Sequence, residues 1–214
     1  MMILSKFLLE IIFVTIIFLH ITKKNFAAVF AYGVQSLMVV TILAISFLAT
    51  GNSPILFVAL ATLAVKVVLA PIFFVKLIQK HKLTFSSSTY LSTPFTLILI
   101  ALLTLTAHSE KLASLSLIVP ANQVLLSLAL SSIFLSVFLI INRKGALSQI
   151  LGILSFENSI VAFSFFAGLE QSPTLQFGII FNIFILVIVA TVFASMIYHH
   201  FGSLDLASLK HLKD

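Results

Sequence analysis

Long apolar runs are the feature that most constrains this chain. Crossing the hydrocarbon core of a bilayer takes roughly 20 mainly apolar residues of helix. Seven stretches meet or approach that length, at residues 3–22, 26–49, 54–78, 90–107, 121–142, 146–168 and 174–198. Only helices and closed barrels satisfy backbone groups in lipid, and these runs lack the alternation of a barrel strand. We therefore predict an all-α membrane bundle of about seven transmembrane helices.

The composition leads to the same class. Of the 214 residues, 61% are hydrophobic and only 8% are charged, whereas soluble domains are roughly 25% charged. The formal charge of +6 is therefore interpreted by position along the chain, and we predict no nucleic-acid partner. Cysteine is absent, which excludes disulfides and thiolate ligands. Arg143 is the one arginine, and we interpret this as a compositional bias.

The positive charges predict the orientation. With seven spans, nine basic residues fall on one side: Lys23, Lys24, Lys76, Lys80, Lys82, Arg143, Lys144, Lys210 and Lys213. Basic residues favour the cytoplasmic side, so we expect the N-terminus outside and the C-terminus in the cytoplasm. The first run is predicted to be a retained span and not a signal peptide, because Glu10 interrupts it and its basic pair follows it.

Two ionisable residues lie at the centres of predicted spans, Lys66 in the third and Glu157 in the sixth. An ionised side chain at that depth costs roughly 2.5–3.5 kcal/mol on insertion scales, so both should face the bundle interior. One interpretation is a structural ion pair that holds two helices together. The other is a proton relay, because burial and a nearby charge shift proton affinities enough for such groups to titrate near neutral pH.

Further polar residues are secondary candidates for proton transfer. Asn158 follows Glu157 directly. Asn182, in the seventh run, is typical of an interhelical contact. His20 is expected to extend toward the membrane boundary, and Lys6, one turn from Glu10, is expected to neutralise that carboxylate.

Two other residues of the spans have expected structural roles. Gln35 is expected to be a packing contact. Pro71 cannot donate a hydrogen bond to the carbonyl of Val67, so we predict a helix kink there, with freed carbonyls beside Lys66.

Motifs for catalysis and for cofactors are not found. The sequence contains no phosphate-binding loop, no dinucleotide glycine pattern and no nucleophile–base arrangement. The pair His199–His200 has nothing nearby that would complete a metal site. We predict a chain without catalytic residues, cofactor or metal of its own.

Three stretches together resemble the hydrogenase-4 component E family of formate hydrogenlyase-type membrane subunits. They are LAVKVVLAPIFF at 63–74, RKGALSQILGILSFENSIVAF at 143–163 and HHFGSLDLASLKHLKD at 199–214. The last spans are also similar to subunit K of NADH-quinone oxidoreductase and to the matching subunit of Mrp-type antiporters. The resemblance divides the chain into a five-span region (1–142), a subunit-K-like two-helix region (143–198) and a cytoplasmic tail (199–214).

The resemblance implies a function. It places the chain in a bacterial plasma-membrane complex with antiporter-like and complex-I-like subunits and a peripheral hydrogenase or iron–sulfur module. Glu157 matches the intramembrane glutamate of subunit K that takes part in coupling redox chemistry to proton movement. A second acid of that family is matched here only by Asn182, and an amide does not hold and release a proton as a carboxylate does.

Three functions therefore stay open. The first is a non-catalytic, proton- or cation-translocating subunit of an oxidoreductase complex. The second is a subunit of an antiporter without redox chemistry. The third is a membrane scaffold in which Lys66 and Glu157 form a static ion pair.

Overall fold

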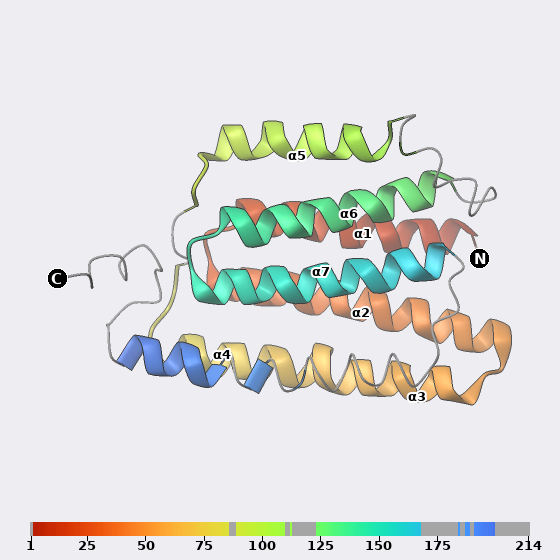
Figure 1. The fold of residues 1–214 in the computed structure, drawn as a ribbon. Helices are drawn as coiled ribbons and strands as arrows, with labels where there is room; N and C mark the ends of the chain where they lie inside the picture. The colour runs from red at the N-terminus through yellow and green to blue at the C-terminus, as the bar shows by residue number, and fades with distance from the viewer. Residues whose placement is uncertain are drawn as a thin grey trace.

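The computed structural model describes residues 2–85, 89–109, 112, 123–167, 184, 187–188 and 191–199. It is a bundle of long, side-by-side helices (Figure 1). In chain order these are α1 (Met2–Ile21), α2 (Asn25–Thr50), α3 (Ser53–Thr62), the π-helix η1 (Leu63–Leu69), α4 (Ala70–Lys80), α5 (Thr93–Ala107), α6 (Gln123–Asn142) and α7 (Ala146–Phe166). The described residues contain no strand, only two isolated bridges between loops, so the predicted all-α class is confirmed.

The helices lie where the apolar runs predict them. Among the described residues, four helices are long and apolar enough to cross a membrane, namely Asn25–Thr50, the continuous stretch Ser53–Lys80, Gln123–Asn142 and Ala146–Phe166. Helices of this length and composition are typical of a membrane protein. Their number is smaller than the seven spans that the sequence predicts. α5 has 15 residues, about 22 Å at 1.5 Å per residue, and α1 has Lys6 and Glu10 in its first half. Most of the seventh run lies outside the described residues.

Local sequence explains where the helices begin and end. Pro54 and Pro94 stand in the first turns of α3 and α5, where a missing N–H is no loss. Gly51 ends α2 with a φ of 66°, and its N–H donates to the carbonyl of Phe47 at 2.8 Å. This left-handed conformation suits glycine because it has no Cβ.

Two buried asparagines connect the helix ends on one side of the bundle. The side chain of Asn25, at the start of α2, donates to the carbonyls of Leu83 and Phe85 in the loop after α4. At the end of α6, the Asn142 side chain accepts from the N–H of Leu91 at 2.9 Å and donates to Thr96 Oγ1 at 3.2 Å.

These contacts bring three basic connections together. They are the α1–α2, α4–α5 and α6–α7 connections, which contain Lys23, Lys24, Lys82, Arg143 and Lys144 (Figure 1). We call this side the basic end.

The interior has two hydrophobic clusters. The one toward the basic end includes Ala28 and Val29 of α2, Phe74 and Leu77 of α4 and Leu151 of α7. The one toward the far end includes Val39 and Ile42 of α2, Val58 of α3, and Ala162 and Phe166 of α7. Between them lie buried or half-buried polar side chains, which we call the polar layer: Gln35, Ser36, Lys66, Ser136, Ser155, Glu157, Asn158 and Ser159. The polar layer therefore lies at mid-bundle.

α6 and α7 pack closely at Gly152. A Cβ added there would lie 2.9 Å from Ile140 Cγ1 and 3.2 Å from the Ile140 backbone nitrogen. A Cβ on Gly33 of α2 would meet only Pro71 Cγ, at 3.9 Å. The backbone of α6 thus has no room for a larger residue at position 152, whereas Gly33 has ordinary van der Waals space.

The two glycines therefore predict opposite responses to alanine. Gly152→Ala should destabilise the purified protein by about 1–3 kcal/mol, because overpacking forces the helices apart. Gly33→Ala is the matched control and should be neutral or stabilising by roughly 0.5–1 kcal/mol, because alanine favours helix. The midpoint of thermal unfolding in detergent, followed by circular dichroism, checks both. Equal midpoints for the two variants would contradict the close α6–α7 packing.

Candidate functional site

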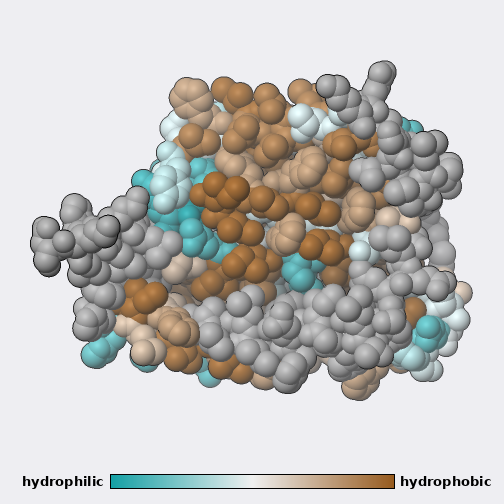
Figure 2. Space-filling view, viewed as in Figure 1, coloured by the Kyte–Doolittle hydropathy of each residue, from teal (hydrophilic) through white to brown (hydrophobic). Residues whose placement is uncertain are grey.

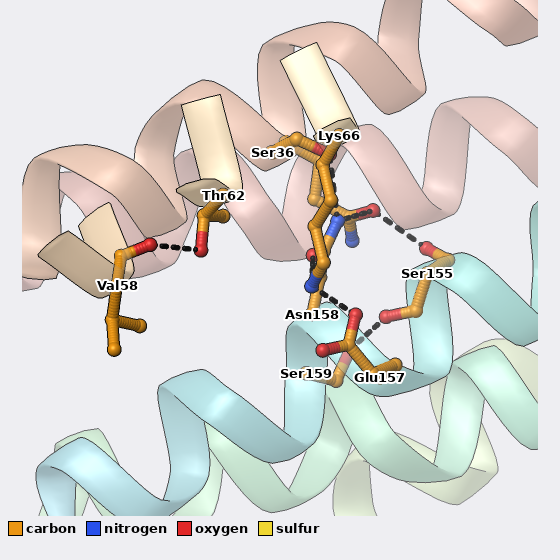
Figure 3. Close-up of polar contacts among 9 residues, drawn as sticks. Ser36, Val58, Thr62, Lys66, Ser155, Glu157, Asn158 and Ser159 are labelled. Atoms are coloured by element: carbon orange, nitrogen blue, oxygen red, sulfur yellow. Dashed lines mark hydrogen bonds and ion pairs between the residues drawn. The ribbon is translucent and has the colours of Figure 1, made fainter. Parts of the chain in front are cut away.

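Lys66 is buried in the middle of a membrane-length helix. It is residue 14 of the 28 in Ser53–Lys80, and it is 1% exposed. The helix changes type around it, because Leu63–Leu69 form a π-helix between α3 and α4. Short π segments within α-helices are rare overall, and many of those that occur lie at functional sites. The segment presents the lysine toward α7 (Figure 3).

Lys66 contacts two consecutive residues of α7. Its ammonium forms an ion pair with Glu157 Oε2 and donates to Asn158 Oδ1 at 3.0 Å (Figure 3). The expectation that both charges face the bundle interior is confirmed. Glu157 is residue 12 of the 21 in α7, so the pair lies near the centres of both helices. An ion pair with an added hydrogen bond is how a buried ammonium is stabilised in a medium without water.

Asn158 links this pair to α2. Its Nδ2 donates to Ser36 Oγ at 3.1 Å and approaches Gln35 Oε1 at 3.4 Å. Ser155 Oγ, one turn earlier on α7, donates to the same Gln35 oxygen at 2.8 Å. Gln35 is therefore part of the polar layer, and the interpretation of it as a packing contact is incomplete.

One side of the Gln35 amide has no hydrogen-bond partner among the described residues. Its Nε2 is buried, as is the hydroxyl of Tyr32, which lies one turn toward the basic end on α2 beside Ser36. A buried N–H or O–H of this kind is a donor that a bridging water can use. The polar layer thus extends along α2 from mid-bundle toward the basic end.

The opposite side of the polar layer reaches α6. The hydroxyls of Ser136 and Ser159 lie 3.1 Å apart, and each is also within hydrogen-bond distance of the carbonyl one turn earlier on its own helix, so each can donate its single proton to one of these two neighbours. Three helices and the π segment therefore meet through polar contacts. Small hydroxyl residues at such interfaces let helices approach closely.

Glu157 is the member of the ion pair with access to the outside of the chain. Its side chain is 17% exposed, whereas that of Lys66 is 1% exposed. Figure 2 shows a hydrophilic patch at mid-bundle within a mainly hydrophobic face. The Glu157 carboxylate is therefore partly open to the outside of the chain, whereas the Lys66 ammonium is enclosed.

Pro71 follows the π segment instead of breaking the helix. It lies in the first turn of α4, and the N–H of Ala70 just before it donates to the carbonyl of Val65, five residues back. The helix thus changes type beside Lys66 within the continuous span Ser53–Lys80, and the predicted kink at Pro71 stays a prediction. The hydroxyl of Thr62, one turn before Lys66, donates to the carbonyl of Val58 at 2.8 Å (Figure 3).

The other candidate residues lie elsewhere. Glu10 points outward from α1 and is paired with Lys6, as predicted, with Nζ and Oε1 3.8 Å apart. His20 does not extend to the membrane boundary, because it is 4% exposed. Its Nε2 lies 3.0 Å from the carbonyl of Leu135, and its ring stacks on Phe138. Asn182 and the tail 200–214 lie outside the described residues.

Arg143 has a role that sequence reasoning missed. Its guanidinium is buried at the basic end and donates from Nη2 to the carbonyls of Leu19, His20 and Thr22 at the end of α1. These are carbonyls that the helix itself leaves unpaired, and a cation is favourable at that end of the helix dipole. The sequence did contain a signal for this role, because the chain has 11 lysines and its one arginine stands here. A guanidinium presents several donors in a fixed plane, which a lysine ammonium does not.

Arg143→Met should therefore loosen the basic end. We expect a loss of unfolding free energy on the order of 3 kcal/mol, because buried carbonyls lose a charged donor. Lys144→Met is the control, since the Lys144 ammonium lies 5.0 Å from the centroid of the Tyr90 ring and an exposed contact of this kind is worth about 0.5–1 kcal/mol. Thermal unfolding of both purified variants checks the difference. A larger loss for Lys144→Met would contradict the capping role.

The chemistry of the polar layer is proton and hydrogen-bond chemistry. One carboxylate, one ammonium, two amides and several hydroxyls are its functional groups. Within the described residues there is no cluster of three or more His, Cys, Asp or Glu side chains that would hold a metal. Comparison of the chain with protein-family models, with curated proteins and with solved structures finds no match.

Proposed function

We propose that this chain is a non-catalytic membrane subunit that carries protons, or a cation coupled to them, through a hydrogenase-4- or complex-I-like oxidoreductase complex. The observation that supports this most is the Lys66–Glu157 ion pair at the centre of the polar layer, together with the partial exposure of the Glu157 side chain. Ionisable residues at membrane depth are costly and mark proton relays and ion pathways. The family resemblance of the regions around both residues adds to this proposal.

The contacts suggest a route within the chain. Glu157 would exchange its proton with Lys66 or with a group outside the bundle. Asn158 and Gln35 would continue the route toward Tyr32 and the basic end, with water completing the step at the buried Gln35 nitrogen. Asn158 and Gln35 hold no exchangeable charge, so their role would be to position donors and water for Lys66 and Glu157.

The proposed topology has seven spans in a bacterial plasma membrane. α1 and α5 would cross together with the four long helices, because α1 packs against α2, α6 and α7 and α5 packs against α6, and the seventh run would follow α7. The basic end would face the cytoplasm, since basic loops favour that side. This puts the N-terminus outside and the tail in the cytoplasm.

Two other functions make different predictions. An antiporter subunit without redox chemistry would use the same ion pair, and a scaffold would keep it static. The ion pair alone favours relay and scaffold equally, because a buried pair also holds helices in register. The partial exposure of the Glu157 side chain, 17%, favours the relay, since a purely structural carboxylate has no need of access to the outside of the bundle.

Co-purification tests the membership of a complex. The tagged chain is extracted from native membranes in mild detergent, and its co-purifying chains are identified by mass spectrometry. We expect antiporter-like membrane subunits together with hydrogenase-like or iron–sulfur proteins. Antiporter-like subunits alone would indicate the non-redox alternative. Recovery of the chain alone, from membranes that contain the neighbouring gene products, would contradict both and favour the scaffold.

A further inference from the structure

A second pair of charged side chains lies on the outside of the bundle. Lys6 and Glu10 stand one turn apart on α1, and their side chains are 56% and 48% exposed. Their separation of 3.8 Å is an ion-pair distance without a hydrogen bond. The same outward face of α1 contains the exposed apolar residues Phe7, Val14 and Phe18. Glu10 therefore interrupts an apolar surface.

Glu10 lies at the depth of the hydrophobic interior. Its neighbours Leu9 and Ile12 are wholly buried in the far-end cluster with Val39 of α2 and Ala129 of α6. Both α2 and α6 are of membrane-spanning length and composition. At 1.5 Å per residue, Glu10 is also about 12 Å along α1 from Met2. Its carboxylate thus faces outward where lipid chains would surround an isolated copy.

The two charges differ in how they can avoid lipid. A lysine near a helix end extends its long side chain to the interface, which Lys6 can do from the first turns of α1. Glu10 is one turn deeper and has a shorter side chain, so it does not reach the interface in the same way. Charged residues inside a membrane almost always pair with one another or face protein, and Lys6 alone does not enclose this carboxylate.

The charge of Glu10 indicates what covers the face. A second copy inserted in the same orientation, related by an axis along the membrane normal, would bring its own Glu10 to the same depth, where like charges repel, and its Lys6, already paired with that Glu10, to the depth of this chain's Lys6, where like charges repel again. A basic side chain from a different helix would complement the carboxylate. We propose that the outward face of α1, formed by Phe7, Glu10, Val14 and Phe18, binds a transmembrane helix of another membrane protein that brings a lysine or arginine to Glu10.

Site-specific photo-crosslinking in native membranes tests this. p-Benzoylphenylalanine is placed at Phe7 or Val14 of the full chain, and at the exposed Phe95 of α5 as a control on another face. We expect the first two positions to give an adduct with the same membrane protein, and the crosslinked peptide to lie in a transmembrane helix with a lysine or arginine. The control position should not give that adduct.

Two variants test the role of the charge. Glu10→Lys should reduce the adduct by about tenfold or more, as expected for an opposed pair of like charges, and exchanging the partner's basic residue for glutamate should restore it. Equal adduct yields with and without Glu10→Lys would overturn the proposal. So would an adduct that contains only peptides of this chain, which indicates a second copy, or the absence of an adduct at both positions, which indicates a lipid-facing surface.

Discussion

Lys66→Met should cost about 3–5 kcal/mol of stability, because it removes one partner of a buried ion pair and leaves the other uncompensated. Glu157→Gln should cost at least as much. Glu157→Gln leaves the Lys66 ammonium, which is 1% exposed, without its counter-charge, whereas Lys66→Met leaves a carboxylate that is 17% exposed. The more deeply buried charge is the more costly one to leave uncompensated. The measurements are the amount of chain in the membrane and the midpoint of thermal unfolding in detergent.

The double variant Lys66→Met/Glu157→Gln is the matched control for these losses. Replacing a whole buried pair by residues of similar volume is often neutral. The double variant should therefore be more stable than either single variant, so its loss should fall short of the sum of the two single losses by about 3 kcal/mol or more. Additive losses would contradict the direct contact of Lys66 with Glu157.

Asn158→Leu is the second change with a large expected effect. The leucine has similar volume but removes an acceptor from Lys66 and a donor to Ser36 and Gln35. Each buried polar group left without a partner costs about 1–3 kcal/mol, so we expect a loss of about 2–4 kcal/mol in unfolding free energy. Thermal unfolding checks it against Ile153→Ala, a half-exposed position on the same helix. If Asn158→Leu were as mild as this control, Asn158 would not connect the ion pair to α2.

A good part of the fold is predictable from the sequence, because bilayer thickness and backbone hydrogen bonding leave few choices for a chain with long apolar runs. The positions of the helices, the all-α class and the central depth of Lys66 and Glu157 follow from run lengths alone. Which helices cross is harder to predict, since α5 is short and α1 contains two charges.

The contacts of the site are less predictable. That Lys66 meets Glu157 within one chain depends on how the third span and α7 are rotated and placed beside each other, and one sequence does not contain that arrangement. The role of Gln35 depends on the same packing, because its partners Ser155 and Asn158 are more than 100 residues away. His20 was misjudged for a related reason. Its position near a helix end suggested access to water, but Phe138 of α6 covers it.

The π segment illustrates a different limit. Pro71 has no N–H to donate, so the hydrogen-bond ladder of the span must change near it. Whether a helix then kinks or widens depends on the neighbours against which it packs. Here the widened turn presents Lys66 to α7, and Ala70 donates five residues back.

Ion movement in membrane vesicles tests the central proposal most directly. Inverted vesicles that contain the native chain, Glu157→Gln or the control Ile153→Ala are energised, and proton and sodium uptake are followed with dyes and normalised to the amount of assembled chain. We expect Glu157→Gln to reduce uptake by about tenfold or more, since a positioned proton-transfer group typically contributes roughly 10²–10⁴-fold, while Ile153→Ala keeps native uptake. Native uptake in assembled Glu157→Gln would contradict the relay and leave the Lys66–Glu157 pair as a structural contact.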